Sequence, residues 1–218
     1  MIDRCPSIAD LAALALPSPP MCNDYGIDIP FRLFVEAFEE LGMPLDVSAG
    51  IPNLEPRDEI WPTERAPVIS LGAAGPGMDM LTWGLPASRP KAPVVINMRS
   101  EGRRFERGRC LIPASHFYEF TGTKNPKTRW RFTRTGEDWF CIAGITGHDG
   151  AAFSMLTVPP GPDVAPIHNR QIVVLQRTDW RSWLEGGVSS ATLLAPSPAG
   201  AFTVAQAPRN ASASLPLG

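Results

Sequence analysis

Short apolar runs bounded by proline or glycine fill the middle of this chain and constrain its fold more than any other feature. Runs of this length and composition are typical of β-strands. The predicted strands cover residues 68–71, 80–85, 94–97, 109–112, 115–120, 129–133, 139–146, 152–158 and 171–175. Turn sequences at 135–137 and 149–150 predict that the strands from 129 to 158 form an antiparallel meander. We therefore expect the α+β class, with a single β-rich domain, a barrel-like antiparallel or mixed sheet and a few short helices.

Two helices are predicted at the ends of this β-rich region. Apolar residues at 31, 34, 35, 38 and 41 recur with the spacing of one helical face, which predicts a core helix over 31–41. Asp28 is its expected N-cap and Gly42 its expected end. Near the C-terminus, Thr178 is expected to cap a second, short helix. The residues of that helix expected to face inward are Trp180, Trp183 and Leu184.

The ends of the chain differ in composition from the predicted domain. Residues 1–20 are rich in Ala, Leu and Pro and end in Pro-Ser-Pro-Pro, which does not continue a helix. We interpret them as an N-terminal extension outside the mature protein, most simply the product of a start codon upstream of Met21. Residues 21–205 form the expected domain, and residues 206–218 form a flexible C-terminal tail.

Composition argues against several classes of protein. No run approaches the roughly 18 uncharged apolar residues that span a membrane, so no membrane partner is expected. The four cysteines, at 5, 22, 110 and 141, lack the spacing of a zinc site or of a disulfide framework. We expect a cytoplasmic protein with reduced thiols, no metal and no organic cofactor. A monomer is the default, because nothing indicates a dimerisation helix.

Charge is distributed unevenly along the chain. Residues 99–134 hold ten of the 20 basic residues and three acidic ones, so this segment carries +7 and the rest of the chain −9. Arg99 and Arg104 lie within it. Such asymmetry is typical of a protein with one groove that faces phosphates. A charge-rich hairpin exposed to water fits the composition equally well.

Met21-Cys22-Asn23 offers a specific chemistry, provided that Cys22 is the first residue of the mature protein. A cysteine with a free α-amine is a 1,2-aminothiol. Its amine condenses with an aldehyde to an imine, the thiolate adds to the imine carbon, and a thiazolidine ring closes. The amine titrates at roughly 7.7–8.0 and a free thiol at about 8.5, so both nucleophiles are partly available at neutral pH. An internal cysteine cannot react in this way.

Three further polar residues are candidates for catalysis. Glu119 shares a strand face with Phe117. Burial would raise the pKa of this carboxyl and suit it to general acid–base work, but the pattern alone favours a glutamate exposed on an edge strand. His168 lies in a proline-framed loop, where function is often placed, although a lone histidine is usually structural. Asn97 ends a predicted strand with Arg99 two residues on, a pair that suits either a phosphate-bearing substrate or a loop cap.

Four strings occur in a characteristic order. They are Met21-Cys22-Asn23, INMRSE at 96–101, RCLIPASHFYEF at 109–120 and IHNRQIVVL at 167–175. Together they resemble the SRAP family, the SOS-response-associated peptidases or abasic-site processing proteins. The resemblance runs from Met21 to about Leu184 and includes the pair Trp83-Gly84. It implies a protein that captures abasic sites in single-stranded DNA, with Cys22 forming a thiazolidine with the aldehyde of the ring-opened sugar.

The resemblance also implies roles for individual residues. Glu119 matches the catalytic glutamate that moves protons during ring opening and imine formation. His168 matches the histidine that assists these steps, and Asn97 the asparagine that positions the cysteine and the sugar. The expected DNA-binding residues are Arg99, Arg170, Trp83 and, from the basic segment, Arg104. The implied partner is single-stranded DNA with abasic sites, which would place this cytoplasmic protein on the nucleoid, and self-processing as a thiol peptidase is a further expectation.

This chain departs from the family pattern at three places. The extension before Cys22 would block thiazolidine chemistry unless translation starts at Met21 or the extension is removed. Asp24 stands where many members carry a small residue followed by arginine, which removes one phosphate contact. The stretch 84–93 lacks the tryptophans that many members have there and carries Arg89-Pro90 instead.

Two other functions fit the same residues. A cysteine peptidase or amidase would use Cys22, His168 and Asn97 and would tolerate an internal Cys22. A non-catalytic relative would keep the DNA-binding groove, and its salt-dependent binding to single strands would survive Cys22→Ala.

Overall fold

A computed structural model describes residues 22–208, apart from residues 49, 51, 88, 90, 124–125 and 148. The predictions for the N-terminal extension, for Met21 and for most of the C-terminal tail lie outside these residues. Within them, no helix combines the length and the apolar character needed to cross a bilayer.

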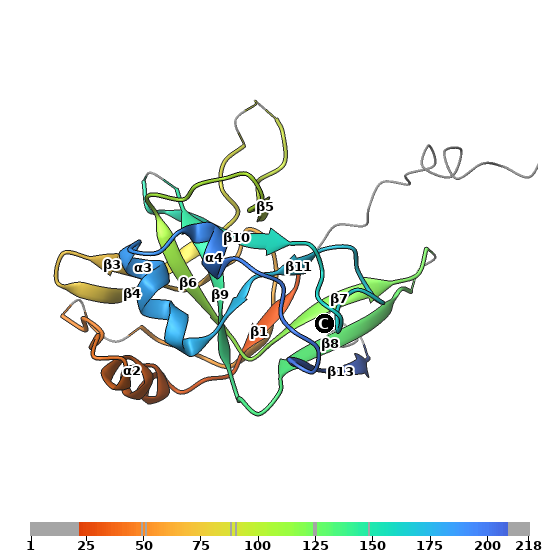
Figure 1. The fold of residues 1–218 in the computed structure, drawn as a ribbon, viewed down its shortest axis with the longest axis horizontal. Helices are drawn as coiled ribbons and strands as arrows, with labels where there is room; N and C mark the ends of the chain where they lie inside the picture. Colours follow the sequence, from red (N-terminus) through yellow and green to blue (C-terminus); the bar gives the residue numbers. More distant parts are fainter. Residues whose placement is uncertain are drawn as a thin grey trace, which may run out of the picture.

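Strands dominate the structure and form two sheets (Figure 1). The five-stranded sheet has the order β13-β8-β7-β1-β2, with neighbouring strands antiparallel. Its strands are β1 (Tyr25–Ile27), β2 (Arg57–Ile60), β7 (His116–Thr121), β8 (Thr128–Arg134) and β13 (Phe202–Ala207). The predicted strands include β7 and β8 but not β1 or β2, and the β2 residues Arg-Asp-Glu-Ile contain only one apolar side chain.

The eight-stranded sheet closes on itself. Strands β10, β4, β3, β6 and β9 pair in a circuit that returns to β10, and a parallel pairing of β10 with β4 completes it. Its strands are β3 (Arg65–Gly72), β4 (Gly75–Trp83), β5 (Asn97–Arg99), β6 (Arg109–Ala114), β9 (Phe140–Thr146), β10 (Ala152–Val158), β11 (Gln171–Ile172) and β12 (Val174–Leu175). The predicted α+β class and barrel-like mixed sheet are therefore confirmed.

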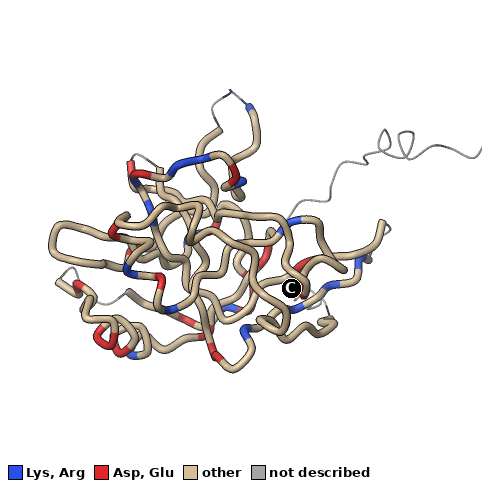
Figure 2. Tube along the Cα trace, in the orientation of Figure 1, with Lys and Arg blue, Asp and Glu red and all other residues tan. Residues whose placement is uncertain are grey.

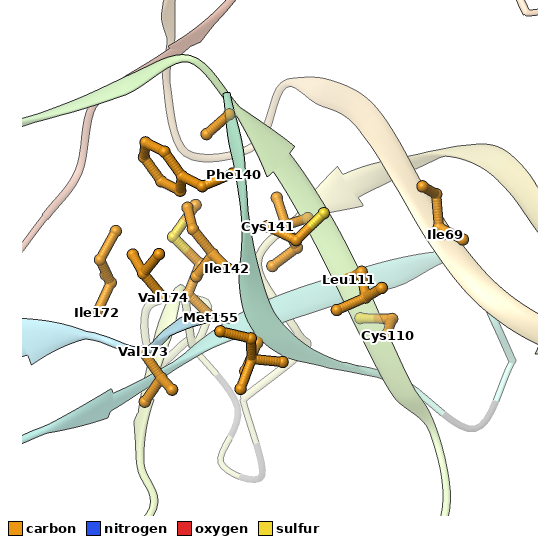
Figure 3. Packing of buried hydrophobic residues seen from close by; sticks show 14 of the residues in the cluster. Ile69, Cys110, Leu111, Phe140, Cys141, Ile142, Met155, Ile172, Val173 and Val174 are labelled. Carbon is orange, nitrogen blue, oxygen red and sulfur yellow. The ribbon is translucent and has the colours of Figure 1, made fainter. Parts of the chain in front are cut away.

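The two sheets share one apolar core. Buried side chains of β6, β9 and β10 pack together with those of the 171–175 segment, as Figure 3 shows around Leu111, Ile142 and Met155. At the other sheet the Phe117 ring stacks on Phe132 with centroids 4.7 Å apart. Each large apolar side chain buried in this way contributes roughly 1.5–3 kcal/mol, so the core dominates the stability of the fold.

The predicted meander is wrong for its first strand. β9 and β10 are antiparallel neighbours, but β8 lies in the five-stranded sheet between β7 and β13. The turn after β8 does not fold the chain back onto it, because the N–H of Thr135 donates to the carbonyl of Ala201 at 3.0 Å. A C-terminal strand thus takes the edge that a local hairpin would have used, and local turn chemistry does not reveal such a long-range pairing.

The predicted core helix is present as α2 (Phe31–Glu40) and buries Phe34, Ala37 and Phe38. Its predicted end is also correct, since Gly42 has a φ of 64° and the N–H of Met43 donates to the carbonyl of Phe38. The predicted cap is wrong. Pro30 occupies the N-cap position, while the N–H of Asp28 donates to the Ser115 hydroxyl at 2.9 Å.

Three short helical segments follow the barrel strands. They are the 3₁₀ turn η1 (Arg177–Asp179), α3 (Trp180–Glu185) and α4 (Ser190–Leu193). The three residues predicted to face inward from α3 are all buried. Thr178 does not cap that helix, because it lies inside η1 and the N-cap position falls on Asp179.

Gly26 of β1 sits where two strands approach closely. A β-carbon added there would lie 2.3 Å from the His116 ring and 2.6 Å from the Asp58 carbonyl oxygen. Gly26→Ala should therefore destabilise the protein by roughly 1–3 kcal/mol, which lowers the Tm by about 3–10 °C in a thermal melt. Gly77→Ala, in a β-strand with open space around the glycine, is the matched control. Equal melting temperatures for the two variants would contradict this packing.

Candidate active site

Cys22 lies directly before β1 and is almost completely enclosed, with 1% of its surface exposed. Its segment runs beside β7, because the N–H of Tyr118 donates to the carbonyl of Asp24 at 2.9 Å. This pairing places the backbone nitrogen of Cys22 next to the following β7 residue, Glu119. The nitrogen donates to Glu119 Oε1 at 3.1 Å.

Asn97 reaches Cys22 from the other sheet. It begins β5, which pairs with β10 at Met155. Its Nδ2 donates to the carbonyl oxygen of Cys22 at 2.9 Å. The structure therefore brings Cys22, Asn97 and Glu119 together between the two sheets, although they are up to 97 positions apart in sequence.

Trp83 supports this site from inside the core. Its ring has no exposed surface, stacks on Phe153 with centroids 6.4 Å apart, and donates from Nε1 to the carbonyl of Ile96 at 2.9 Å. That bond fixes the residue immediately before Asn97. A fully buried ring has no face on which a base could stack, so the expectation that Trp83 contacts DNA is wrong. Trp83 instead holds the backbone beside Asn97.

Glu119 is a buried carboxyl with a strongly raised pKa. It is 1% exposed, and burial raises its pKa to about 8, although the hydrogen bond from the Cys22 nitrogen lowers it in part. The interpretation as a water-exposed edge-strand glutamate is therefore wrong. At neutral pH the carboxyl is mostly protonated and can donate a proton, as a general acid requires.

The Cys22 thiol is also held neutral. Burial raises its pKa most strongly, and the carboxyl of Glu119 adds to the effect. The sulfur makes a long contact of 3.8 Å with the carbonyl of Asp24. A thiol in these surroundings needs a base to remove its proton before it can attack.

His168 lies in the loop before β11 and is 6% exposed. Its Nδ1 accepts a hydrogen bond from the backbone N–H of Arg170 at 3.1 Å. A neutral ring therefore carries its proton on Nε2, which is buried and has no hydrogen-bond partner among the described residues. The described hydrogen bonds of His168 lead to Arg170 and not to Cys22 or Glu119.

Arg170 does not present a free guanidinium. Both terminal nitrogens pair with the carboxylate of Glu101, and Nη2 also donates to the carbonyl and the hydroxyl of Thr157. This pairing lowers the pKa of Glu101 to about 2. Arg170 therefore does not offer the expected phosphate contact. Its side chain joins the His168 loop to the segment after β5.

Some arginines of the basic segment are paired within the chain and others are exposed. Arg109, Arg129 and Arg134 are engaged by carbonyl or carboxylate oxygens of this chain, so they are not free for phosphates. Four exposed arginines remain on β5 and on the loop that follows it, and we call them the basic ridge: Arg99, Arg103, Arg104 and Arg107. Figure 2 shows blue segments gathered beside β5 and red segments on α2.

The basic ridge borders two depressions in the surface. A cavity of about 550 Å³ lies between the 100–104 segment and the region of α4, and Arg103 and Arg104 line it. A second cavity of about 690 Å³ is lined by Arg104 and Arg107. Among the described residues, no salt bridge involves Arg103, Arg104 or Arg107.

A charged cluster behind Cys22 was missed by the sequence interpretation. Arg129 Nη2 lies 2.7 Å from Asp24 Oδ2 and 2.7 Å from Glu59 Oε1, and its guanidinium carbon is 3.4 Å from the centre of the Tyr118 ring. The sequence offered one signal: Arg129 and Arg131 alternate on β8, which places both on the sheet face of Tyr118. The acidic partners of Arg129 come from distant segments, so the sequence does not place them near it. Asp24 is therefore fully buried and paired, a role beyond the lost phosphate contact that the sequence indicates.

Metal ligation has no clear basis in the described part of the chain. No group of three or more His, Cys, Asp or Glu residues there is arranged to hold a metal ion.

Comparisons with known proteins agree with this fold. Three similar solved structures are a protein from Bordetella bronchiseptica, a protein from Bacteroides thetaiotaomicron and a phage-related protein from Bordetella bronchiseptica. Their identities to this chain are 20%, 17% and 20%, and their TM-scores are 0.63, 0.66 and 0.65. The alignments cover 86%, 86% and 85% of this chain and 100%, 93% and 94% of the other chains. No curated protein matches this sequence.

A profile of the family described as SOS response associated peptidase (SRAP) matches residues 21–210. The match includes Cys22, Asn97, Glu119 and His168, and it confirms the resemblance seen in the four sequence strings. This chain belongs to the SRAP family.

Proposed function

We propose that this protein captures abasic sites in single-stranded DNA by forming a thiazolidine between Cys22 and the aldehyde of the ring-opened sugar. In this proposal the mature chain begins at Cys22, and the protein acts as a monomer on DNA in the cytoplasm during the DNA damage response. One observation carries it: the Cys22 nitrogen, a peptide N–H in the full chain, lies 3.1 Å from the carboxyl of Glu119, whose pKa is raised to about 8 in that chain. A nucleophilic amine beside a protonated acid is the arrangement that imine formation needs.

The first half of the reaction uses Glu119 as an acid. The free amine of Cys22 adds to the aldehyde carbon and gives a carbinolamine. Glu119 then donates its proton to the carbinolamine hydroxyl, which leaves as water, and the iminium and the Glu119 carboxylate remain. A carboxyl with a pKa near 8 is well matched to this transfer at neutral pH.

The second half of the reaction returns the proton. The Glu119 carboxylate removes the proton from the Cys22 thiol, whose own pKa is raised by burial. The sulfur adds to the iminium carbon and closes the five-membered ring. Glu119 is protonated again, and the net change joins the amine, the thiol and the aldehyde with the loss of one water.

Asn97 and His168 complete the proposed site. Asn97 holds the carbonyl of Cys22 at 2.9 Å and so fixes the amine relative to Glu119. His168 carries a proton on Nε2 that has no described partner, which suits it to donate to the sugar ring oxygen or the hydroxyl of the opened sugar.

The basic ridge is the proposed track for the DNA backbone. Replacing Arg103, Arg104 and Arg107 by Gln should weaken binding to an undamaged single strand. It should also reduce the slope of log K against log salt concentration by about 2, because each lost phosphate contact accounts for about 0.7. Fluorescence anisotropy over a salt series measures both effects.

The matched control removes three arginines elsewhere: Arg32, Arg177 and Arg181. An equal loss in this control would contradict the assignment of the ridge.

The alternative of a cysteine peptidase or amidase has less support. A Cys-His-Asn hydrolase needs its imidazole next to the thiol, with the asparagine orienting the ring. Here Asn97 bonds the carbonyl of Cys22 and the His168 Nδ1 is occupied by Arg170. A non-catalytic single-stranded DNA-binding protein would share the ridge but would form no covalent product.

The test compares the full chain with a chain that begins at Cys22. Each is incubated with a single-stranded oligonucleotide that carries one abasic site and then run on a denaturing gel. We expect a heat-stable adduct only when Cys22 is the first residue. Cleavage of peptide or amide substrates by the full chain, without any adduct, would favour the hydrolase instead. Salt-dependent binding with no adduct from either chain would favour the inert binder.

A further inference from the structure

We propose that Arg129 is a positioning residue for the Cys22 reaction: through Asp24 and Glu59 it fixes the segment that holds the Cys22 amine against Glu119. This inference rests on the proposed function and adds to it a residue that does not touch the substrate. It assigns a task to the most completely buried ionic cluster in the described part of the molecule.

Arg129 is held from three sides. Its side chain is 2% exposed, and Nη2 lies 2.7 Å from the carboxylates of both Asp24 and Glu59. Its guanidinium carbon is 3.4 Å from the centroid of the Tyr118 ring. A buried guanidinium between two carboxylates and an aromatic face has little freedom to move, so it also restrains the groups around it.

The residues that Arg129 holds adjoin the two reacting groups. Asp24 follows Cys22 by two positions, and Tyr118 immediately precedes Glu119. The two strands are joined at this point by the bond from the Tyr118 N–H to the Asp24 carbonyl at 2.9 Å. Loss of Arg129 would leave the Asp24 carboxyl buried without its partner, whether the group stays charged or takes up a proton, and the segment would be free to shift. Such a shift would move the Cys22 nitrogen away from the Glu119 carboxyl.

Charge links the cluster to the thiol as well. The groups that face Asp24 are Arg129 from β8 and Glu59 and Asp58 from β2. Arg131 and His116 lie farther along the same sheet face. Burial raises the pKa of Asp24 to about 7, against the lowering effect of Arg129. The charge of Asp24 in turn helps to raise the pKa of the Cys22 thiol. Asp24→Asn should therefore lower the apparent pKa of that thiol.

The experiment uses chains that begin at Cys22 and carry Arg129→Met, Arg129→Lys, Asp24→Asn or the control Arg131→Met. The rate of adduct formation is measured at temperatures where each variant is folded. Iodoacetamide labelling of Cys22 across pH gives a second readout. Arg129→Met should slow adduct formation at least about tenfold, and Arg129→Lys should recover part of the rate. Asp24→Asn, which still accepts a hydrogen bond from Arg129, should keep most of the rate but shift the labelling profile to lower pH.

Arg131→Met should react within about twofold of the unmodified chain, because Arg131 bonds His116 and not Asp24. A folded Arg129→Met variant that forms the adduct at the unmodified rate would overturn the positioning role while leaving the proposed function intact. If the unmodified chain forms no adduct, the proposed function fails. In that case the pH profiles of iodoacetamide labelling test the positioning role. Profiles of Asp24→Asn and Arg129→Met that both match the unmodified chain would overturn it.

Discussion

Cys22→Ala, in a chain that begins at residue 22, should abolish the heat-stable adduct with abasic DNA completely. The variant keeps a free α-amine, and the nitrogen of residue 22 lies beside Glu119 in the structure, so it can still form an imine. It lacks the sulfur that closes the ring, and imines hydrolyse readily. We therefore expect an adduct from this variant only after trapping with borohydride, whereas the unmodified chain needs no reductant.

Cys110→Ala and Cys141→Ala are the matched controls for this experiment. Both are buried cysteines of the barrel, and burial raises the pKa of each thiol. Neither lies at the amino end of the proposed mature chain, so both variants should form the adduct without reductant. A heat-stable, borohydride-independent adduct from Cys22→Ala would show that another nucleophile reacts and would remove the thiazolidine from the account.

Glu119→Gln should have the second-largest effect on capture. Loss of a positioned general acid typically costs about 10²–10⁴-fold in rate. The rate of the unmodified chain should first rise with pH as the Cys22 amine, which ordinarily titrates at roughly 7.7–8.0, loses its proton. It should then fall at alkaline pH, because Glu119 gives up the proton that it must donate. The variant should lack this fall. Single-turnover adduct formation from pH 6 to pH 9 measures both effects, and Glu137→Gln, at an exposed surface carboxyl, is the control.

The same substitution should stabilise the fold at alkaline pH. The pKa of Glu119 is about 8 in the folded chain and near its ordinary value of 4.5 in the unfolded chain, so the folded state holds this proton more tightly. The free energy of unfolding therefore carries no penalty from a charged Glu119 below pH 4.5, and it falls as the pH rises from 4.5 toward 8. Removing a charge that is costly to bury should raise the free energy of unfolding at pH 8.5 by roughly 2–5 kcal/mol. A variant that is less stable at pH 8.5 would contradict the raised pKa.

Much of the fold could be predicted from local sequence. The spacing of Phe31, Phe34 and Phe38 predicted α2, and apolar runs between prolines and glycines predicted most of the strands. Pairing was harder to predict, because β8 pairs on one side with β13, which lies some 70 positions later, and not with β9, the next strand in sequence. The polar strand β2 carried no periodic signal at all, and only its place beside β1 makes it a strand.

The candidate site was predicted unevenly, and the reason is burial. Sequence strings pointed to Cys22, Asn97 and Glu119, and the structure brings these three together. Whether an individual polar residue faces water or the core depends on segments far away in sequence. For this reason Glu119 was judged exposed on its pattern alone, and Trp83 was assigned to DNA although its ring lies wholly inside the protein.

The arginines illustrate the same limit. Composition counts Arg129 as part of a basic segment that suits DNA, and the family resemblance assigns Arg170 to DNA binding. In the structure both are neutralised by carboxylates that the sequence does not place near them, namely Asp24 and Glu59 for Arg129 and Glu101 for Arg170. Among the described residues, the exposed basic ridge keeps charge that a phosphate backbone could contact.

Intact-protein mass spectrometry would test the central claim most directly. The chain that begins at Cys22 is measured before and after incubation with a single-stranded oligonucleotide containing one abasic site. We predict a new species whose mass equals that of the protein plus the oligonucleotide minus one water, with the modification on the Cys22 residue after digestion. A chain that begins at Cys22, is folded, and gains no mass under these conditions would contradict the proposed capture of abasic sites.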